Sequence, residues 1–168
     1  AKGYGVDRVA AALSNLGLEN FLVEIGGEVY VKGLKSGNRK WLVGISEPAT
    51  EMRTASVYVA TQLSNQAMAT SGSYRNFLKL DSGEKTVTHI IDPRTGYPAD
   101  NRVVSVSVIA PNCTKADGLA TAMFVMGIEQ SLKLAENDPE IEIFLIEELP
   151  NGGFVNHMST GMGAYLKQ

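Results

Sequence analysis

His89 is one of only two histidines in the chain, and an acidic and a basic side chain follow it closely, at Asp92 and Arg94. A histidine can accept a proton near neutral pH. A guanidinium can hold a phosphate through two parallel hydrogen bonds. The same residues also fit a purely structural interpretation, in which His89 makes hydrogen bonds at the end of a strand and Pro93 forms a turn.

Asp117 and Thr121 are four residues apart at the start of an apolar run. On a helix this spacing puts both side chains on one face, with Cβ atoms about 6 Å apart. Carboxylate and hydroxyl oxygens are hard ligands that suit Mg²⁺ or Ca²⁺. The alternative is that Asp117 only stabilises the start of the helix and that Thr121 has no special role. Together with a histidine and an arginine, the oxygen pair favours metal-assisted chemistry on a phosphate ester.

Two glycine-containing segments, residues 24–28 and 70–74, indicate either a bulge or turn, or a backbone that a ligand approaches closely. Neither is a dinucleotide fingerprint or a P-loop. His157 has no neighbours in sequence that complete a site. Cys113 is the only cysteine, which excludes a disulfide within the chain and argues against a thiolate zinc site.

The bulk composition is that of a single globular domain. The chain has 168 residues, 44% of them hydrophobic and 20% charged, and a net charge of −3. With this charge and no basic stripe, we expect no nucleic-acid partner. No apolar run reaches the length needed to span a membrane. Because the chain opens at Ala1 without Met or a signal peptide, we expect it to be part of a longer protein.

The hydrophobic pattern predicts an α+β fold with a largely antiparallel sheet and packed helices, since the strands come in groups and do not alternate with helices. The expected helices cover residues 6–16 and two segments between 112 and 137, divided at Gly127. The expected strands cover residues 20–31 with an interruption at 26–27, then 41–45, 57–63, 66–70, 86–91, 102–110, 141–146 and 153–158. Residues 71–73 are expected to break a strand, residues 74–80 to form a helical turn or another strand, and residues 102–110 to keep one face in solvent.

Five motifs occur in an order that resembles the FAD:protein FMN transferase family, once described as thiamine-biosynthesis lipoproteins. They lie at residues 1–7, 24–28, 69–74, 89–98 and 116–122. The resemblance extends over nearly the whole chain and is to the C-terminal part of a typical member. It therefore implies one domain, residues 1–168, with a flavin-transferase-like fold that is incomplete at its N-terminus.

The resemblance implies an enzyme that transfers FMN from FAD to a Ser or Thr hydroxyl of an acceptor flavoprotein subunit or domain. The FMN is joined through a phosphoester bond and AMP is released. Mg²⁺ would bridge the pyrophosphate, with Asp117 and Thr121 as side-chain ligands. A backbone carbonyl ligand would lie upstream of Lys2, in residues before Ala1.

The remaining implied site residues are His89 as the catalytic histidine, and Lys2 and an isoleucine at Ile90 or Ile91 as flavin contacts. Arg94 would neutralise charge on the phosphoryl oxygens. The residues leave open whether His89 or Asp117 takes the proton from the attacking hydroxyl.

Two other functions would use the same pocket. One is a non-catalytic module that binds or carries FAD, and the other is an FAD pyrophosphatase that releases FMN and AMP. The resemblance also implies the bacterial periplasm or the outer face of the inner membrane, with attachment only through a lipid anchor outside this chain.

Overall fold

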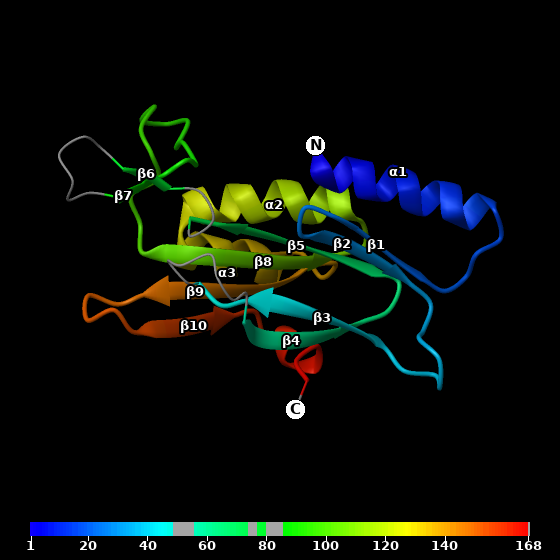
Figure 1. Cartoon of the computed structure of the whole chain (residues 1–168). Helices are drawn as coiled ribbons and strands as arrows, with labels where there is room; N and C mark the ends of the chain where they lie inside the picture. Colours follow the sequence, from blue (N-terminus) through cyan, green and yellow to red (C-terminus); the bar gives the residue numbers. More distant parts are fainter. Residues whose placement is uncertain (49–55, 74–76, 80–85, 168) are drawn as a thin grey trace.

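A computed structural model describes residues 1–48, 56–73, 77–79 and 86–167 (Figure 1). Its helices are α1 (Lys2–Asn15), α2 (Cys113–Met126), α3 (Ile128–Asn137) and a short 3₁₀ helix, η1 (Met162–Ala164). Its strands are β1 (Phe21–Ile25), β2 (Glu28–Lys32), β3 (Trp41–Ser46), β4 (Val57–Leu63), β5 (Gln66–Gly72), β6 (Phe77–Lys79), β7 (Thr86–Thr88), β8 (Val103–Ala110), β9 (Glu142–Glu148) and β10 (Phe154–Met158).

The described strands form a central sheet of order β1-β2-β5-β8-β9-β10, and each neighbouring pair in it is antiparallel. The three α-helices lie on one face of this sheet, and the β3–β4 hairpin lies on the other with the C-terminal turn (Figure 1). Each face has its own apolar core, one shared with the helices and one shared with the hairpin and η1. The α+β prediction with a largely antiparallel sheet is confirmed.

Most of the predicted elements are found where the sequence places them. Helix α1 begins at Lys2, four residues earlier than expected, and is followed by Gly17 at φ +81°. The two helices between residues 112 and 137 are confirmed, with Gly127 (φ +80°) between them. Of the expected segment 74–80 only residues 77–79 are described, and they form a strand. No helix in the described ranges is long and apolar enough to cross a membrane.

Gly26 and Gly27 form the turn of a hairpin, which is one of the alternatives expected for residues 24–28, and not a bulge. Their φ angles are +62° and +100°, and Ile25 pairs with Glu28 directly across them. Two residues with positive φ are what a tight two-residue hairpin turn requires. The predicted strand over residues 20–31, interrupted at 26–27, is therefore two antiparallel strands, β1 and β2, joined by this turn.

Three strand predictions were wrong, and in the first two the cause is a pairing partner or a covering layer that the local pattern does not show. Strand β5 continues through Ser71 and Gly72, where β8 supplies a pairing partner. The serine face of β8 is not in solvent: Ser105 and Ser107 are at most 1% exposed. Near the loop, β7 ends at Thr88, and Ile91 makes only an isolated bridge to Pro98.

Candidate functional site

The first turn of α2 is anchored by Asp7, which reaches across from α1. Asp7 Oδ1 accepts a hydrogen bond from the Cys113 amide at 2.8 Å, and Oδ2 accepts from the amide of Thr114 at 2.8 Å and from its hydroxyl. Asn112 caps the same turn by accepting from the Lys115 amide. These contacts satisfy amide groups that a helix start leaves unpaired. They also fix α2 relative to α1.

Asp117, one turn further along α2, lies against the start of α1. Its Oδ2 accepts a hydrogen bond from the Gly3 amide at 2.9 Å. A Cβ on Gly3 would lie 2.3 Å from the Cys113 carbonyl oxygen and 2.7 Å from the Asp117 Cβ, so only glycine allows this approach. No residue of the described ranges donates a hydrogen bond to Asp117 Oδ1, and the side chain is 19% exposed. That oxygen is therefore available to a ligand.

Thr121 follows Asp117 by one helical turn, as predicted, and a strand residue fixes its hydroxyl. Thr121 Oγ1 lies 2.9 Å from Ser71 Oγ on β5 and donates to the Asp117 carbonyl oxygen at 3.3 Å. Ser71 is part of the motif at residues 69–74, but its contact with Thr121 was not predicted, because residues 71–73 were expected to break the strand. Strand periodicity from Ala67 and Ala69 would have put Ser71 on the helix-covered face.

Lys2 is held by a carboxylate that the sequence analysis did not single out. Its Nζ lies 2.8 Å from Glu28 Oε1 and 3.4 Å from the Gly26 carbonyl oxygen. Glu28 is 2% exposed. The Gly26–Gly27 turn thus brings β2 under the start of α1, where Lys2 is next to Gly3, the residue whose amide binds Asp117.

The charges at this junction surround a thiol. Burial first, and then the nearby carboxylates of Asp7, Glu28 and Asp117, raise the pKa of Cys113 to about 12, while Lys2 opposes them. A thiol with such a pKa is protonated at neutral pH and is a poor nucleophile. The same electrostatic influences show that three carboxylates and one ammonium group lie around the first turns of α2.

Residues 89–98 form a loop held largely by contacts within itself. The Arg94 amide and Nε donate to Asp92 Oδ1 at 2.8 and 3.0 Å, and Nη2 donates to Oδ2 at 2.7 Å. These hydrogen bonds lower the pKa of the Asp92 carboxyl. The guanidinium predicted to bind phosphate is thus oriented by Asp92, and its side chain is 61% exposed.

The loop lies toward the other end of α2 from Asp117, on the helix-bearing face of the sheet (Figure 1). Asn101, just after the loop, donates to the Phe124 carbonyl oxygen at 2.8 Å. Phe124 is seven residues beyond Asp117, or about 10 Å along the helix axis. His89 is exposed at the start of the loop.

Of the two isoleucines predicted as flavin contacts, Ile90 is buried in the core and Ile91 is 50% exposed. Only Ile91 therefore presents an accessible side chain. The functional roles predicted for these residues, and for His89 and Arg94, stay predictions.

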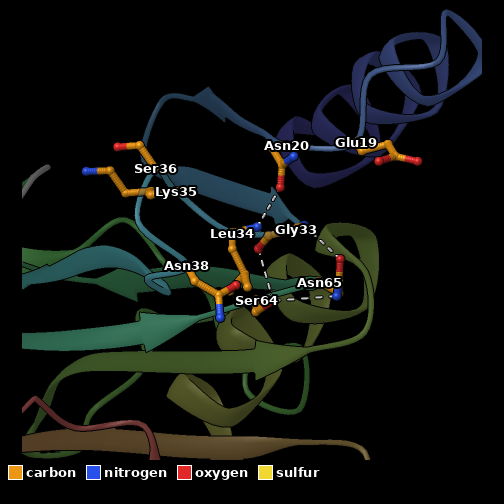
Figure 2. Close-up of a pocket in the computed structure, with 9 residues that line it drawn as sticks. All are labelled: Glu19, Asn20, Gly33, Leu34, Lys35, Ser36, Asn38, Ser64 and Asn65. Carbon is orange, nitrogen blue, oxygen red and sulfur yellow. Dashed lines mark hydrogen bonds between the residues drawn. The ribbon is translucent and has the colours of Figure 1, made fainter.

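A cleft of ≈ 580 Å³ opens elsewhere, between the loops that follow α1, β2 and β4 (Figure 2). The polar groups in it largely bond to one another: Asn20 accepts from the Leu34 amide, and Gly33 is bound by Asn65 and Ser64. Asn20 follows the C-terminal end of α1, whereas Lys2 is at its start, about 20 Å away for a helix of this length. We therefore assign the site to the α1–α2 junction and not to this cleft.

The junction has the chemistry of a hard-metal site. Asp117 Oδ1 and the Thr121 hydroxyl are oxygens on one helix face, which Mg²⁺ prefers over nitrogen or sulfur. Across the described ranges no group of three or more His, Cys, Asp and Glu residues is arranged so that it could hold a metal ion by itself. The two side chains therefore fit an ion whose other ligands are water, main-chain or phosphate oxygens.

Residues 1–145 match the ApbE family. The chain belongs to this family. A relative from Vibrio cholerae, named FAD:protein FMN transferase, is 42% identical over 168 residues, which are 100% of this chain and 48% of the relative. A relative of the same name from Haemophilus influenzae is 40% identical, over 95% of this chain and 45% of the relative.

Solved structures of ApbE proteins show the same fold. The flavin transferase ApbE from Vibrio cholerae superposes with a TM-score of 0.80 at 40% identity, covering 98% of this chain and 50% of that protein. The ApbE protein from Thermotoga maritima gives a TM-score of 0.80 at 34% identity, covering 99% of this chain and 52% of that protein. The chain thus spans about half the length of the ApbE proteins it matches.

Proposed function

We propose that this chain is the metal-holding part of an FAD:protein FMN transferase. The observation that carries the proposal is the Asp117 carboxylate, fixed through Oδ2 by the Gly3 amide with Oδ1 left open beside the Thr121 hydroxyl. The names of the ApbE relatives support FAD as the FMN donor and a protein as the acceptor. Mg²⁺, bound by Asp117 and Thr121, would supply charge neutralisation on the pyrophosphate of FAD.

In the proposed reaction, a Ser or Thr hydroxyl oxygen of the acceptor protein attacks the phosphorus of the FMN half. A new P–O bond joins FMN to the acceptor, the pyrophosphate P–O bond breaks, and AMP leaves with the bridging oxygen. The hydroxyl proton passes to a base on this chain. We assign that role to His89, because one oxygen of Asp117 is already bonded to Gly3 and the other is assigned to the metal.

Arg94 would neutralise charge on the phosphoryl oxygens of the bound FAD. Its Nη2 and Nε groups are bonded to Asp92, so its Nη1 edge is the part of the fork open to a phosphate oxygen. Asp92 orients the guanidinium and holds it close to the chain. This assignment explains why an exposed arginine is fixed by four hydrogen bonds to one neighbour.

The test is to incubate the full-length protein with FAD, Mg²⁺ and a peptide that contains a Ser or Thr acceptor, and to follow the products by mass spectrometry. The proposal expects a peptide heavier by one FMN, together with AMP, and no product when Mg²⁺ is chelated. Free FMN and AMP without labelled peptide would identify a pyrophosphatase instead. Bound but unreacted FAD would identify a carrier.

A further inference from the structure

Glu28 is a buried carboxylate to which the proposed reaction assigns no role. Its side chain is 3% exposed, and its Oε1 accepts a hydrogen bond from Lys2 Nζ at 2.8 Å. Its Oε2 is buried and has no hydrogen-bond partner among the residues that the structure describes. A buried carboxylate oxygen without a partner is costly, and folded proteins contain few of them. Such a residue therefore needs an explanation beyond stability.

The contacts of Lys2 indicate what the carboxylate does. An ammonium group has three N–H donors. One points to Glu28, and a second lies 3.4 Å from the Gly26 carbonyl oxygen, so one donor remains. The Lys2 stem lies on the Gly26 backbone, with Cδ 3.2 Å from the position of a Cβ there. Because the side chain is still 52% exposed, the remaining donor is open to a ligand.

The charge of the pair indicates which ligand atom this donor suits. Glu28 neutralises the Lys2 ammonium at 2.8 Å, so the pair offers no net positive charge to a phosphate. A fixed N–H on a neutral pair suits a neutral acceptor, such as a carbonyl oxygen or an aromatic ring nitrogen. The isoalloxazine ring of a flavin carries both kinds of acceptor.

We propose that Glu28 is a positioning residue for the flavin. It holds Lys2 over the Gly26–Gly27 turn so that the third N–H of the ammonium donates to a neutral acceptor on the flavin ring. A lysine side chain has about 2 kcal/mol of rotamer entropy to lose, and the ion pair restricts it before the flavin binds. This inference rests on the proposed function, because it requires the site to bind a flavin.

The direction in which FAD affinity changes in Glu28→Gln separates this role from the alternative, in which Lys2 binds a phosphate. Glu28→Gln keeps the shape of the side chain and removes its charge. If Glu28 positions Lys2 for a neutral acceptor, the variant binds FAD about tenfold more weakly, the size expected for disturbing a hydrogen bond to a charged group. If Lys2 instead serves a phosphate, removing the nearby negative charge strengthens FAD binding at low salt, and the gain disappears at high salt.

We would titrate the full-length protein with FAD and follow flavin fluorescence at about 50 mM and about 500 mM NaCl. The variants are Glu28→Gln, Lys2→Met and the double variant, with Glu147→Gln as the matched control. Glu147 also lies within hydrogen-bond distance of a basic side chain, His157 at 2.9 Å, but on the β9–β10 edge of the sheet. The proposal expects Glu28→Gln to bind FAD more weakly than the wild type at both salt concentrations, and Glu147→Gln to bind FAD with wild-type affinity.

The double variant tests whether Glu28 acts through Lys2. In a Lys2→Met background, Glu28→Gln should change FAD affinity by less than about twofold, because residues that act through one contact are not additive. Lys2→Met leaves a buried unpaired carboxylate. If that variant does not fold, the direction of the change in FAD affinity in Glu28→Gln alone decides between the two roles. Wild-type affinity or tighter binding in Glu28→Gln overturns this inference and leaves the proposed function standing. A wild-type protein that binds no FAD overturns both.

Discussion

Asp117 is held by an amide 114 positions away at Gly3, and its helix is anchored by Asp7 from 106 positions away. In the loop at residues 89–98, by contrast, Asp92 and Arg94 hold each other at a separation of two residues. Both regions lie on the helix-bearing face of the sheet, at opposite ends of α2 (Figure 1). The side-chain geometry of the α1–α2 junction therefore depends on the whole fold, whereas that of the loop depends mainly on contacts within the loop.

The difference has a mechanical consequence. The positions of side chains at the α1–α2 junction depend on how the two helices pack. Substitutions there should therefore alter both stability and function. Side chains in the loop are oriented by a local turn, so changes there should alter function with little effect on unfolding. Each prediction below tests this contrast with one pair of measurements, activity or affinity against stability.

The largest effect is expected for Asp117→Asn. The amide oxygen can still accept from Gly3, but the charge that binds the metal is lost. Metal-ion catalysis contributes several kcal/mol to transition-state stabilisation, so the rate of FMN transfer should fall by about 10⁴-fold. Single-turnover transfer and direct Mn²⁺ binding would measure the two losses. Asp138→Asn is the control, because Asp138 forms a surface ion pair with Lys115, and it should keep both the transfer rate and Mn²⁺ binding.

His89→Ala should remove transfer and leave the fold intact. Loss of a general base costs roughly 10²–10⁴-fold in rate. FAD affinity should change much less, because the role lies in the transition state. Thermal unfolding should be unchanged, since the residue is exposed in a locally held loop. A variant that binds FAD far more weakly yet transfers normally once saturated would make His89 a binding residue.

Two helical glycines test the junction through stability alone. A Cβ at Gly3 would overlap the Cys113 carbonyl, whereas a Cβ at Gly118 would meet nothing within 4 Å. Gly3→Ala should therefore destabilise by about 1–3 kcal/mol, as overpacking does. Gly118→Ala should stabilise by about 0.5–1 kcal/mol through helix propensity. Urea unfolding of both variants gives the comparison, and equal effects would mean that the helices do not pack closely at Gly3.

What the sequence predicts best are features with local causes. The divided helix pair at Gly127, the antiparallel sheet and the turn at Asp92 and Pro93 all follow from short-range patterns, and the structure has each of them. The Gly26–Gly27 hairpin also had a local signal, since paired glycines between apolar runs indicate a tight turn. The sequence left a bulge and a turn both open at these glycines, and the structure has the turn.

What the sequence cannot show are contacts made by tertiary packing. Ser71 meets Thr121 only because β5 passes under α2, and Glu28 meets Lys2 only because a hairpin folds beneath α1. Asp7 caps a helix that begins more than 100 residues later. No spacing rule connects these pairs. The serine face of β8 was assigned to solvent for the same reason, because the β3–β4 layer that covers it is distant in sequence.

Arg94→Ala should, like His89→Ala, alter function with little effect on stability, and the loss of function should be smaller. Phosphate charge is present in the ground state as well as the transition state, so FAD affinity should fall roughly tenfold together with the rate. The melting temperature should stay within about 1 °C, since exposed ion pairs contribute little. Fluorescence titration and thermal unfolding would measure these two quantities. A large loss of stability with normal FAD affinity would make Arg94 a structural residue only.

The last prediction concerns pH, where the two regions should respond at opposite ends of the scale. The junction raises the pKa of Cys113 from an ordinary 9.0 to about 12, so the folded chain favours the protonated thiol. Its contribution to stability is complete below pH 9 and is lost by about 1 kcal/mol per pH unit as the pH rises toward 12. In the loop, hydrogen bonds from Arg94 lower the pKa of Asp92. That contribution is present above the ordinary value of 3.8 and is lost as the pH falls through the lowered value.

Matched variants isolate these contributions from the titration of the rest of the chain. The free energy of unfolding of the wild type minus that of Cys113→Ala should decrease as the pH rises above 9, because only the wild type loses the favoured thiol. The same difference for Asp92→Asn should stay constant there and should decrease only in acid, and by less, because the Asp92–Arg94 pair is on the surface. If the Cys113 difference were constant between pH 8 and pH 10.5, the thiol would not be buried at the junction beside its carboxylates. The contrast between the two regions would then fail at a fully buried group.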